Sequence, residues 1–366
     1  MPSPPFQTPD QVVDVSTWER VEGYGVYPEG SREKRLLRCP AVAPHPFLIP
    51  GRKYLLKYSR DRYPAQYWCE ILAYRIGSRL DLDVPPAHVA IDGKGRAAAL
   101  IEWFLEEEKG ETRISGGDYL VGLEPEFDRK KGVGHSWSLV KQVLETFSDS
   151  FRDWKWTWFN MMAFDTLIGN TDRHQENWAF IRAPEPITRP LLSNINPISG
   201  NINGSGNPLD EDLNVYWIGG SPPDWDAYLG TSDWQHPWFG KIRFGPFFDN
   251  GTSLGHELAD DKIVSMTDGD LLHYIRKGRA HLRWEGQNNK GLGHFELIDR
   301  LLQEEPRYRS ILEAYEPLTP ELIGNLVESL TAFQVPEALP KVRGDFMARL
   351  VTLRRQELLA RLHDTP

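Results

Sequence analysis

The sequence contains few cysteines and no long apolar run. Only two cysteines, Cys39 and Cys69, occur among 366 residues, and they form neither a Cys-x-x-Cys pair nor a metal-ligand cluster. This favours a reducing compartment, with one disulfide as the alternative. No apolar run approaches the roughly 20 residues of a membrane helix. The N-terminus also lacks the basic and apolar regions of a signal peptide. We therefore expect a cytoplasmic protein with no membrane partner.

Basic charge is also scarce. The 42 Lys and Arg are outnumbered by 52 Asp and Glu, which gives a net charge of -10 and a pI of about 5.6. Since nonspecific nucleic-acid binding depends on basic patches, no direct nucleic-acid partner is expected. A local basic groove stays compatible with this balance, because net charge averages over the whole surface. Hydrophobic residues make up 40% of the chain, enough for a sizeable core, and the length suggests two domains or lobes.

Residues 20–105 have the pattern of strands interrupted by one helix. "GRKYLLKYS" follows a Pro-Gly turn, and "AHVAID" and "RAAALIEWF" flank the hairpin turn "DGKG". Between them, "YPAQYWCEILAYRIGSRL" repeats apolar residues at helical spacing until two prolines end it. We expect a small, β-rich lobe over residues 1–105.

The remainder of the chain, residues 106–366, has the pattern of a larger helical lobe. Helical spacing marks "SWSLVKQVLETFSDSF", "WKWTWFNMMAFDTLIG", "DDKIVSMTDGDLLHYIRKGRA", "GHFELIDRLLQ", "TPELIGNLVESLTAFQ" and "RGDFMARLVTLRRQELLARLHD". Residues 183–240 are rich in Asn, Gly, Ser and Pro, and we interpret them as an insertion within this lobe. The fold class predicted is therefore α+β with two lobes.

A dense polar cluster lies between two apolar segments in "LIGNTDRHQENWAFI". Asp172 and Asn177 have the D-x-x-x-x-N spacing of a kinase catalytic loop. Phosphoryl transfer requires a carboxylate beside the attacking hydroxyl and a neutral oxygen ligand for Mg²⁺, and Asp and Asn supply these groups. Arg173 and His174 are interpreted as supports of the loop or as hydrogen-bond donors to a metal-binding Asp. Alone, the pair is equally compatible with a cap or a turn.

A second carboxylate follows an apolar strand in "KIRFGPFFDNGTSLG". Asp249 occupies the position of the aspartate that binds Mg²⁺ in protein kinases, and carboxylate oxygens are the hard ligands that Mg²⁺ prefers. By itself "DNG" is ordinary turn chemistry. The order of a buried helix, the D-x-x-x-x-N loop, an apolar strand and "FDNG" is far more specific.

The small lobe offers candidates for binding phosphate. Lys57 ends an apolar strand, with Lys53 as the second choice, and Glu70 on the following helix is expected to pair with Lys57. A Gly-Ser turn with Gly30, Ser31 and Lys34 can present backbone N–H groups to phosphate. The alternatives are a water-facing lysine, an exposed glutamate and an ordinary hairpin turn.

Together these motifs resemble HipA-type serine/threonine kinases over roughly residues 25–360. The resemblance implies a protein-kinase-like fold, ATP and Mg²⁺ as cofactors, and a protein substrate with a Ser or Thr acceptor. It implies Asp172 as the catalytic residue and Asn177 and Asp249 as metal ligands. It further implies that "LIEWF" is the hinge, with backbone groups of Glu102 and Trp103 for adenine. It also implies a possible toxin role with an antitoxin protein and autophosphorylation at Ser31.

The sequence departs from that family in three respects. Asn177 and Asp249 are separated by 72 positions, whereas the family connection is short. The start of the chain leaves no room for the extra N-terminal subdomain, which indicates a compact member. "DRHQEN" also resembles the D-R-H-x-x-N loop of phosphoinositide lipid kinases. The alternatives are therefore a lipid or small-molecule kinase and a non-catalytic nucleotide-binding scaffold.

Overall fold

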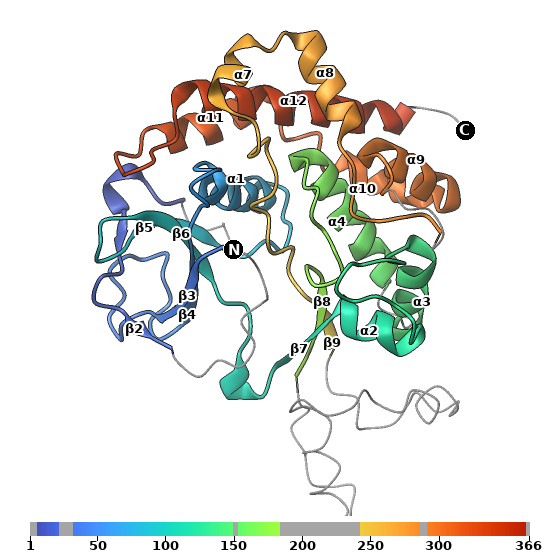
Figure 1. The fold of residues 1–366 in the computed structure, drawn as a ribbon, viewed down its shortest axis with the longest axis horizontal. Coiled ribbons are helices and arrows are strands. Elements are labelled where there is room, and N and C mark those ends of the chain that lie inside the picture. Colours follow the sequence, from blue (N-terminus) through green and yellow to red (C-terminus); the bar gives the residue numbers. More distant parts are fainter. Residues whose placement is uncertain (1–5, 22–31, 149–152, 184–241, 286–290, 364–366) are drawn as a thin grey trace, which may run out of the picture.

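The computed structural model describes residues 6–21, 32–148, 153–183, 242–285 and 291–363. Strands and one helix dominate the first part of the chain, and helices dominate the rest (Figure 1). The predicted α+β class is therefore confirmed. The interpretation of residues 183–240 as an insertion lies almost wholly outside the described residues.

A six-stranded sheet is built from the first hundred residues. Its spatial order is β1-β5-β6-β4-β3-β2, with bounds β1 (Val13–Asp14), β2 (Glu19–Arg20), β3 (Lys34–Arg38), β4 (Lys53–Lys57), β5 (Ala87–Ile91) and β6 (Ala97–Glu102). Only β1 pairs in parallel, and β5 and β6 form the predicted hairpin around "DGKG". Lys34 lies directly opposite Lys57 across β3 and β4, so both side chains emerge on one face of the sheet.

Helix α1 (Gln66–Arg79) is buried on every side. All its residues from Gln66 to Gly77 are buried, as expected for a helix covered all round. One side packs on β5 and β6, and α11 (Pro320–Thr331) packs on another, as Figure 1 shows. At Gly77 a Cβ would lie 2.4 Å from Val84, so only glycine fits this contact. The sheet and the C-terminal helices thus enclose α1.

The rest of the chain surrounds α4 (Trp154–Ile168), which packs against α3 (Trp137–Phe147), α9 (His294–Glu304) and α12 (Lys341–His363). A three-stranded sheet of order β7-β8-β9 lies below it in Figure 1. The other elements are β7 (Thr112–Ser115), α2 (Gly116–Leu123), β8 (Ala179–Arg182), β9 (Ile242–Phe244), α7 (Asp260–Ser265), α8 (Asp268–Lys277), α10 (Arg309–Glu313) and 3₁₀ turns at Pro9–Gln11, Glu107–Lys109 and Pro306–Tyr308. Helix α2 was not predicted.

The single helix predicted over residues 260–280 is wrong, because the chain forms α7 and α8 there. Thr267 is the N-cap of α8, and its Oγ1 accepts the Asp270 N–H at 3.2 Å. The Asp270 carboxylate in turn accepts the Thr267 N–H at 3.0 Å. This capping box starts a new helix within an otherwise continuous periodic pattern, and "TDGD" was its sequence signal.

Three buried histidines predict how stability depends on pH. Burial lowers the pKa of His88, His135 and His294 to about 3. Below pH ~6.5 the unfolded chain binds protons at these positions and the native state does not. The free energy of unfolding is therefore highest above that pH and falls as the pH drops, by up to about 1.4 kcal/mol per pH unit for each histidine. Urea denaturation between pH 8 and pH 5 measures this slope.

His88 gives the sharpest test of this expectation. In the described ranges neither ring nitrogen of His88 has a hydrogen-bond partner, and the centroid of its ring lies 4.5 Å from that of Phe47. His88→Phe is therefore expected to reduce the pH slope without loss of stability at pH 8. The matched control His273→Phe replaces an exposed histidine of α8 and should leave the slope unchanged. Equal slopes for wild type and His88→Phe would contradict the assignment.

Candidate active site

Lys57 lies at the end of β4 and joins two carboxylates from distant parts of the chain. Its Nζ donates to Glu70 Oε1 at 2.8 Å and to Asp249 Oδ1 at 2.6 Å. The ion pair between Lys57 and Glu70 expected from the sequence is therefore present. Lys53, the second choice, pairs instead with Glu107 at 3.0 Å. Of the two candidate lysines, Lys57 is the one that pairs with Asp249.

Arg32 adds a second cation that the sequence reasoning missed. Its Nη2 donates to Glu70 Oε1 at 2.6 Å and to Asp249 Oδ1 at 3.2 Å, whereas its Nη1 is buried and has no hydrogen-bond partner among the described residues. A Cβ at position 251 would lie 2.3 Å from this guanidinium, so Gly251 makes room for it. The only sequence signal was its position directly after Gly30 and Ser31, both of which lie outside the described residues.

Burial and the neighbouring cations have opposite effects on the pKa values of the two carboxylates in this cluster. Burial raises the pKa of Glu70 and Asp249, but the charges of Lys57 and Arg32 outweigh it and hold both pKa values below their ordinary range. The Asp249 side chain is 34% exposed, against 3% for Glu70. Asp249 is therefore the carboxylate that a ligand can reach. Across the sheet, burial and then the charge of Lys57 lower the pKa of Lys34 to about 8.

The backbone orients Asp249 toward these cations. Asp249 has φ 58°, in the left-handed region that Asp tolerates better than most residues. The next residue, Asn250, donates its N–H to Glu70 Oε2 at 2.9 Å. Glu70 therefore accepts from Lys57 and Arg32 through one oxygen and anchors the turn after Asp249 through the other.

The loop with Asp172 and Asn177 closes on itself through backbone groups. Helix α4 ends at Gly169, with φ 68°. The Asp172 N–H donates to Asn170 Oδ1 at 3.1 Å, and Asn177 Nδ2 donates to the Asp172 carbonyl at 2.7 Å. The Asp172 side chain is 45% exposed, and its Oδ1 lies 4.0 Å from His174 Nε2. Partial burial raises the pKa of Asp172, His174 opposes this rise, and Asp249 adds to it.

Arg173 connects this loop to the segment that carries Asp249. It is buried and donates to both oxygens of Asp165 on α4, each at 2.8 Å. It also donates to the Asn177 carbonyl at 2.8 Å, to the Phe248 carbonyl and to Asn250 Oδ1 at 2.9 Å. Arg173 thus supports the loop, and it holds the two neighbours of Asp249 rather than Asp249 itself.

The available oxygen atoms fit a divalent cation such as Mg²⁺. Since Asn177 Nδ2 is bonded within the loop, its Oδ1 is the atom left for a metal, and Asp249 offers an accessible carboxylate. Over the described ranges, no group of three or more His, Cys, Asp or Glu side chains is arranged to hold a metal. In kinases, one or two protein ligands suffice, because oxygens of the nucleotide phosphates and water occupy the other positions around Mg²⁺.

The predicted hinge residues are the last residue of β6 and the residue that follows it, and the N–H groups of both are already hydrogen-bonded. The Glu102 N–H donates to the Pro86 carbonyl at 2.8 Å, and the Trp103 N–H donates to the Lys53 carbonyl at 3.0 Å. Any contact of these two residues with adenine would therefore use their carbonyl oxygens. Beside them, Trp103 packs with Leu36 and Ile181 into a small apolar cluster.

The fold and the grouping of these residues place the protein in the class of two-lobed, kinase-like folds. Residues 29–192 match the family model of the HipA-like C-terminal domain. The resemblance predicted from the sequence is thereby confirmed over this part of the chain. The matched range contains Lys57, Glu70, Asp172 and Asn177, and it ends before Asp249.

Comparison with one solved structure supports this fold class. The chain is similar to the Helicobacter pylori proinflammatory kinase CtkA, with a TM-score of 0.63 and 16% identity, covering 96% of this chain and 97% of that chain. It also aligns with HipA in the Shewanella oneidensis MR-1 HipA, HipB and operator DNA complex. That alignment has a TM-score of 0.44 and 13% identity, and covers 93% of this chain and 66% of that chain. A search of curated proteins finds no match. Among the described helices, none is long and apolar enough to cross a membrane.

Proposed function

We propose that the protein is an ATP-dependent serine/threonine kinase of HipA type. The observation that carries this proposal is that Lys57, Glu70 and Asp249 meet in one cluster. Arg173 ties this cluster to the loop of Asp172 and Asn177 through hydrogen bonds. The Lys57–Glu70 ion pair, Asp249, Asp172 and Asn177 would supply the four functional parts that phosphoryl transfer requires of a kinase: the phosphate-binding lysine with its glutamate, a metal-binding carboxylate, the catalytic carboxylate and a neutral metal ligand. The proposed lobes are residues 1–105 and 106–366.

ATP would be bound by groups of both lobes. Lys57 and the unpartnered Nη1 of Arg32 would contact phosphate oxygens, and Lys34 would add charge from the same face of the sheet. Gly30 and Ser31 would complete the phosphate loop, and the carbonyls of Glu102 and Trp103 would face adenine. Asn177 and Asp249 would hold Mg²⁺, which when bound neutralises phosphate charge.

Asp172 would act on the acceptor hydroxyl. Its carboxylate is half exposed, and no hydrogen bond to it is recorded in the described part of the chain, so it is available to accept the hydroxyl proton. The acceptor oxygen then attacks the terminal phosphorus of ATP, and ADP leaves. Arg173 fixes the loop without contacting the Asp172 carboxylate. Arg173 would therefore position the loop, whereas Asp172 would take part in the reaction.

The finer assignments rest on the family resemblance. We propose a protein substrate with a Ser or Thr acceptor, an antitoxin partner with a toxin role, and autophosphorylation at Ser31. Mass spectrometry of the purified protein after incubation with ATP and Mg²⁺ tests the last point. Phosphate found only at other residues would contradict it, and co-purification from a strain expressing the neighbouring genes tests the partner.

Lys57→Met and Lys53→Met form a matched pair that tests the proposed ATP site. Lys57→Met is expected to lower phosphoryl transfer from labelled ATP by at least about 100-fold, because it removes a charge from the phosphate-binding cluster. Lys53→Met removes a lysine of the same strand that pairs with Glu107 and should retain activity within a few-fold. Equal activity of the two variants would contradict the proposed role of Lys57. The absence of phosphoryl transfer by wild type would contradict the proposed function.

A further inference from the structure

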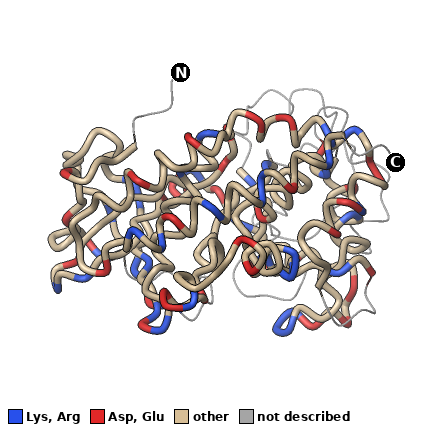
Figure 2. Tube along the Cα trace, turned by 90° about the horizontal axis from the view of Figure 1, so that it is seen from above, with Lys and Arg blue, Asp and Glu red and all other residues tan. Residues whose placement is uncertain are grey.

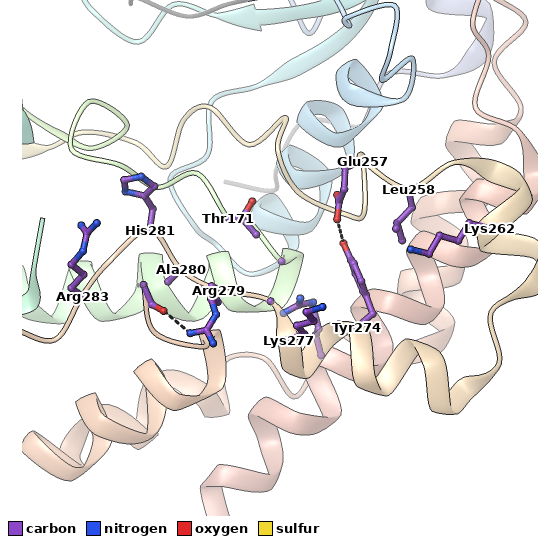
Figure 3. A pocket seen from close by; sticks show the side chains of 14 residues that line it. Thr171, Glu257, Leu258, Lys262, Tyr274, Lys277, Arg279, Ala280, His281 and Arg283 are labelled. Carbon is purple, nitrogen blue, oxygen red and sulfur yellow. Dashed lines mark hydrogen bonds between the residues drawn. The ribbon is translucent and has the colours of Figure 1, made fainter. Parts of the chain in front are cut away.

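A cavity of about 740 Å³ opens beside the start of the Asp172 loop. Its wall includes Gly169 and Thr171 from that loop, Glu257 from the segment before α7, Lys262 from α7 itself, and the end of α8 with the residues that follow it (Figure 3). No sequence motif and no step of the proposed ATP site accounts for it. Its volume lies within the usual range of ligand sites.

The wall of this cavity is strongly basic. Only one carboxylate lines it, Glu257, which accepts a hydrogen bond from the Tyr274 hydroxyl at 2.6 Å (Figure 3). Five cations line it, and none forms an ion pair with any residue that the structure describes: Lys262, Lys277, Arg279, Arg283 and Arg354. Elsewhere in Figure 2 acidic and basic residues are interspersed, and the whole chain carries a net charge of -10. The cavity is therefore a local concentration of positive charge.

Arg354 is a buried cation that forms no ion pair with any described residue, although the charge of Glu257 acts on it. It is 2% exposed, and its Nη1 donates to the Thr166 carbonyl at 2.9 Å and lies 3.3 Å from His294 Nδ1. Its Nε has no hydrogen-bond partner in the part of the chain that the structure describes. Burial lowers the pKa of Arg354 to about 10, so it stays protonated at neutral pH at a cost in free energy. A Cβ at Gly169 or at Gly278 would come within 2.9 Å of this guanidinium. Two glycines thus accommodate a charge that an incoming anion would compensate.

The cavity is also close to the proposed site of chemistry. Thr171 adjoins Asp172 in the chain, and the ring of His281, which lines the cavity, lies 5.8 Å from that of His174. Burial lowers the pKa of His281, and the charge of Asp172 acts in the opposite direction. ATP phosphates would be held by the separate cluster around Lys57. The cavity therefore lies where the acceptor, rather than the nucleotide, would bind.

We propose that this basic cavity binds acidic side chains that flank the acceptor Ser or Thr in a protein substrate. The inference rests on the proposed kinase function and specifies its substrate class. Carboxylates of the substrate would approach the exposed Lys277 and Arg279 at the rim and the guanidinium of Arg354 inside. The acceptor hydroxyl would then be presented next to Asp172.

Direct binding tests the proposal without depending on catalysis. The probe is a fluorescein-labelled peptide with one serine flanked by Asp and Glu, and its Asn/Gln counterpart is the uncharged control, measured by fluorescence anisotropy at 0.15 M salt. We expect the acidic peptide to bind at least about tenfold more tightly. The double variant Lys277→Glu with Arg279→Glu should remove this preference. Equal binding of the two peptides by wild type would overturn the proposal.

A charge-matched variant separates local from global electrostatics. Lys94→Glu with Lys341→Glu changes net charge by the same amount at exposed positions that do not line the cavity. It should bind the acidic peptide as wild type does. If it weakens binding as much as the cavity variant, general charge attraction is the cause and the proposal fails. Stronger competition by inositol trisphosphate than by unlabelled acidic peptide would assign the cavity to a lipid head group and overturn the proposal.

Kinetics with the same peptides distinguish failure of this inference from failure of the proposed function. We expect a KM for the acidic peptide about tenfold below that for the neutral one, with the preference lost in the Lys277→Glu, Arg279→Glu variant. Phosphorylation of both peptides with equal KM would leave the kinase function standing and overturn the acidic-substrate inference. Selective binding without phosphorylation would support the cavity assignment and contradict the kinase function.

Discussion

Asp172→Asn is expected to reduce phosphoryl transfer by about 10²–10⁴-fold, the usual contribution of a positioned general base. The amide has the same shape as the carboxylate but cannot take a proton from the acceptor hydroxyl. Among the described residues, Asp172 helps to hold the loop through its backbone N–H and carbonyl, which bond to Asn170 and Asn177, and not through its carboxylate. The free energy of unfolding should therefore change by less than about 0.5 kcal/mol.

A second carboxyl group in the same loop provides the control for this experiment. Glu176 pairs with Arg129 at 2.8 Å and has no place in the proposed chemistry. Glu176→Gln should retain activity close to wild type, measured with labelled ATP and the same acceptor. Labelling by Asp172→Asn at the wild-type rate would show that the assignment of Asp172 is wrong.

Arg173→Met is expected to cost about 3–5 kcal/mol in the free energy of unfolding, the range for breaking a buried ion pair. The variant leaves the Asp165 carboxylate buried without its cation, and it leaves the Phe248 carbonyl without this donor. Urea denaturation measures the loss. Arg129→Met is the matched control, because Arg129 also pairs with two carboxylates but is about half exposed, and it should cost less than about 1 kcal/mol.

A double-mutant cycle separates the ion pair from the other contacts of Arg173. Asp165→Leu removes the buried carboxylate that Arg173→Met leaves unpaired. The double variant should therefore be more stable than the sum of the two single losses predicts, by about 1–3 kcal/mol. Strict additivity would mean that the pair contributes nothing of its own, and the loss would then belong to the carbonyl and amide contacts.

Local patterns predicted the parts of the site that depend on neighbouring residues. Helical periodicity placed Glu70 on a buried helix, and the end of an apolar strand placed Lys57 within reach of it. Spacing alone paired Asp172 with Asn177, and the structure joins them by a hydrogen bond to the backbone of Asp172. In each case fewer than twenty positions separate the partners, so secondary structure determines their geometry.

The parts that sequence reasoning missed depend on contacts between distant segments. Arg32 reaches Asp249 across 217 positions, and apart from its place directly after Gly30 and Ser31 no feature of the sequence distinguishes it from the other arginines. Arg354 reaches the Thr166 carbonyl across 188 positions, so the basic cavity exists only once α12 packs on α4. The apolar strand before Glu102 and Trp103 located the predicted hinge. The sequence could not show that both N–H groups are already bonded, because their acceptors, the carbonyls of Pro86 and Lys53, lie on other segments.

The enclosure of α1 has a consequence for regulation. Many kinases are switched by moving the helix that carries this glutamate, and such motion requires one face of the helix to be free. Here the sheet and α11 cover α1, and the N–H of Asn250 is anchored to Glu70. Moving α1 and Glu70 away from this site would expose buried apolar surface. It would also leave the buried cations Lys57 and Arg32 without the carboxylate that they share. We therefore expect the ion pair between Lys57 and Glu70 to be formed at all times. Any control of activity would then act on the binding of nucleotide or substrate.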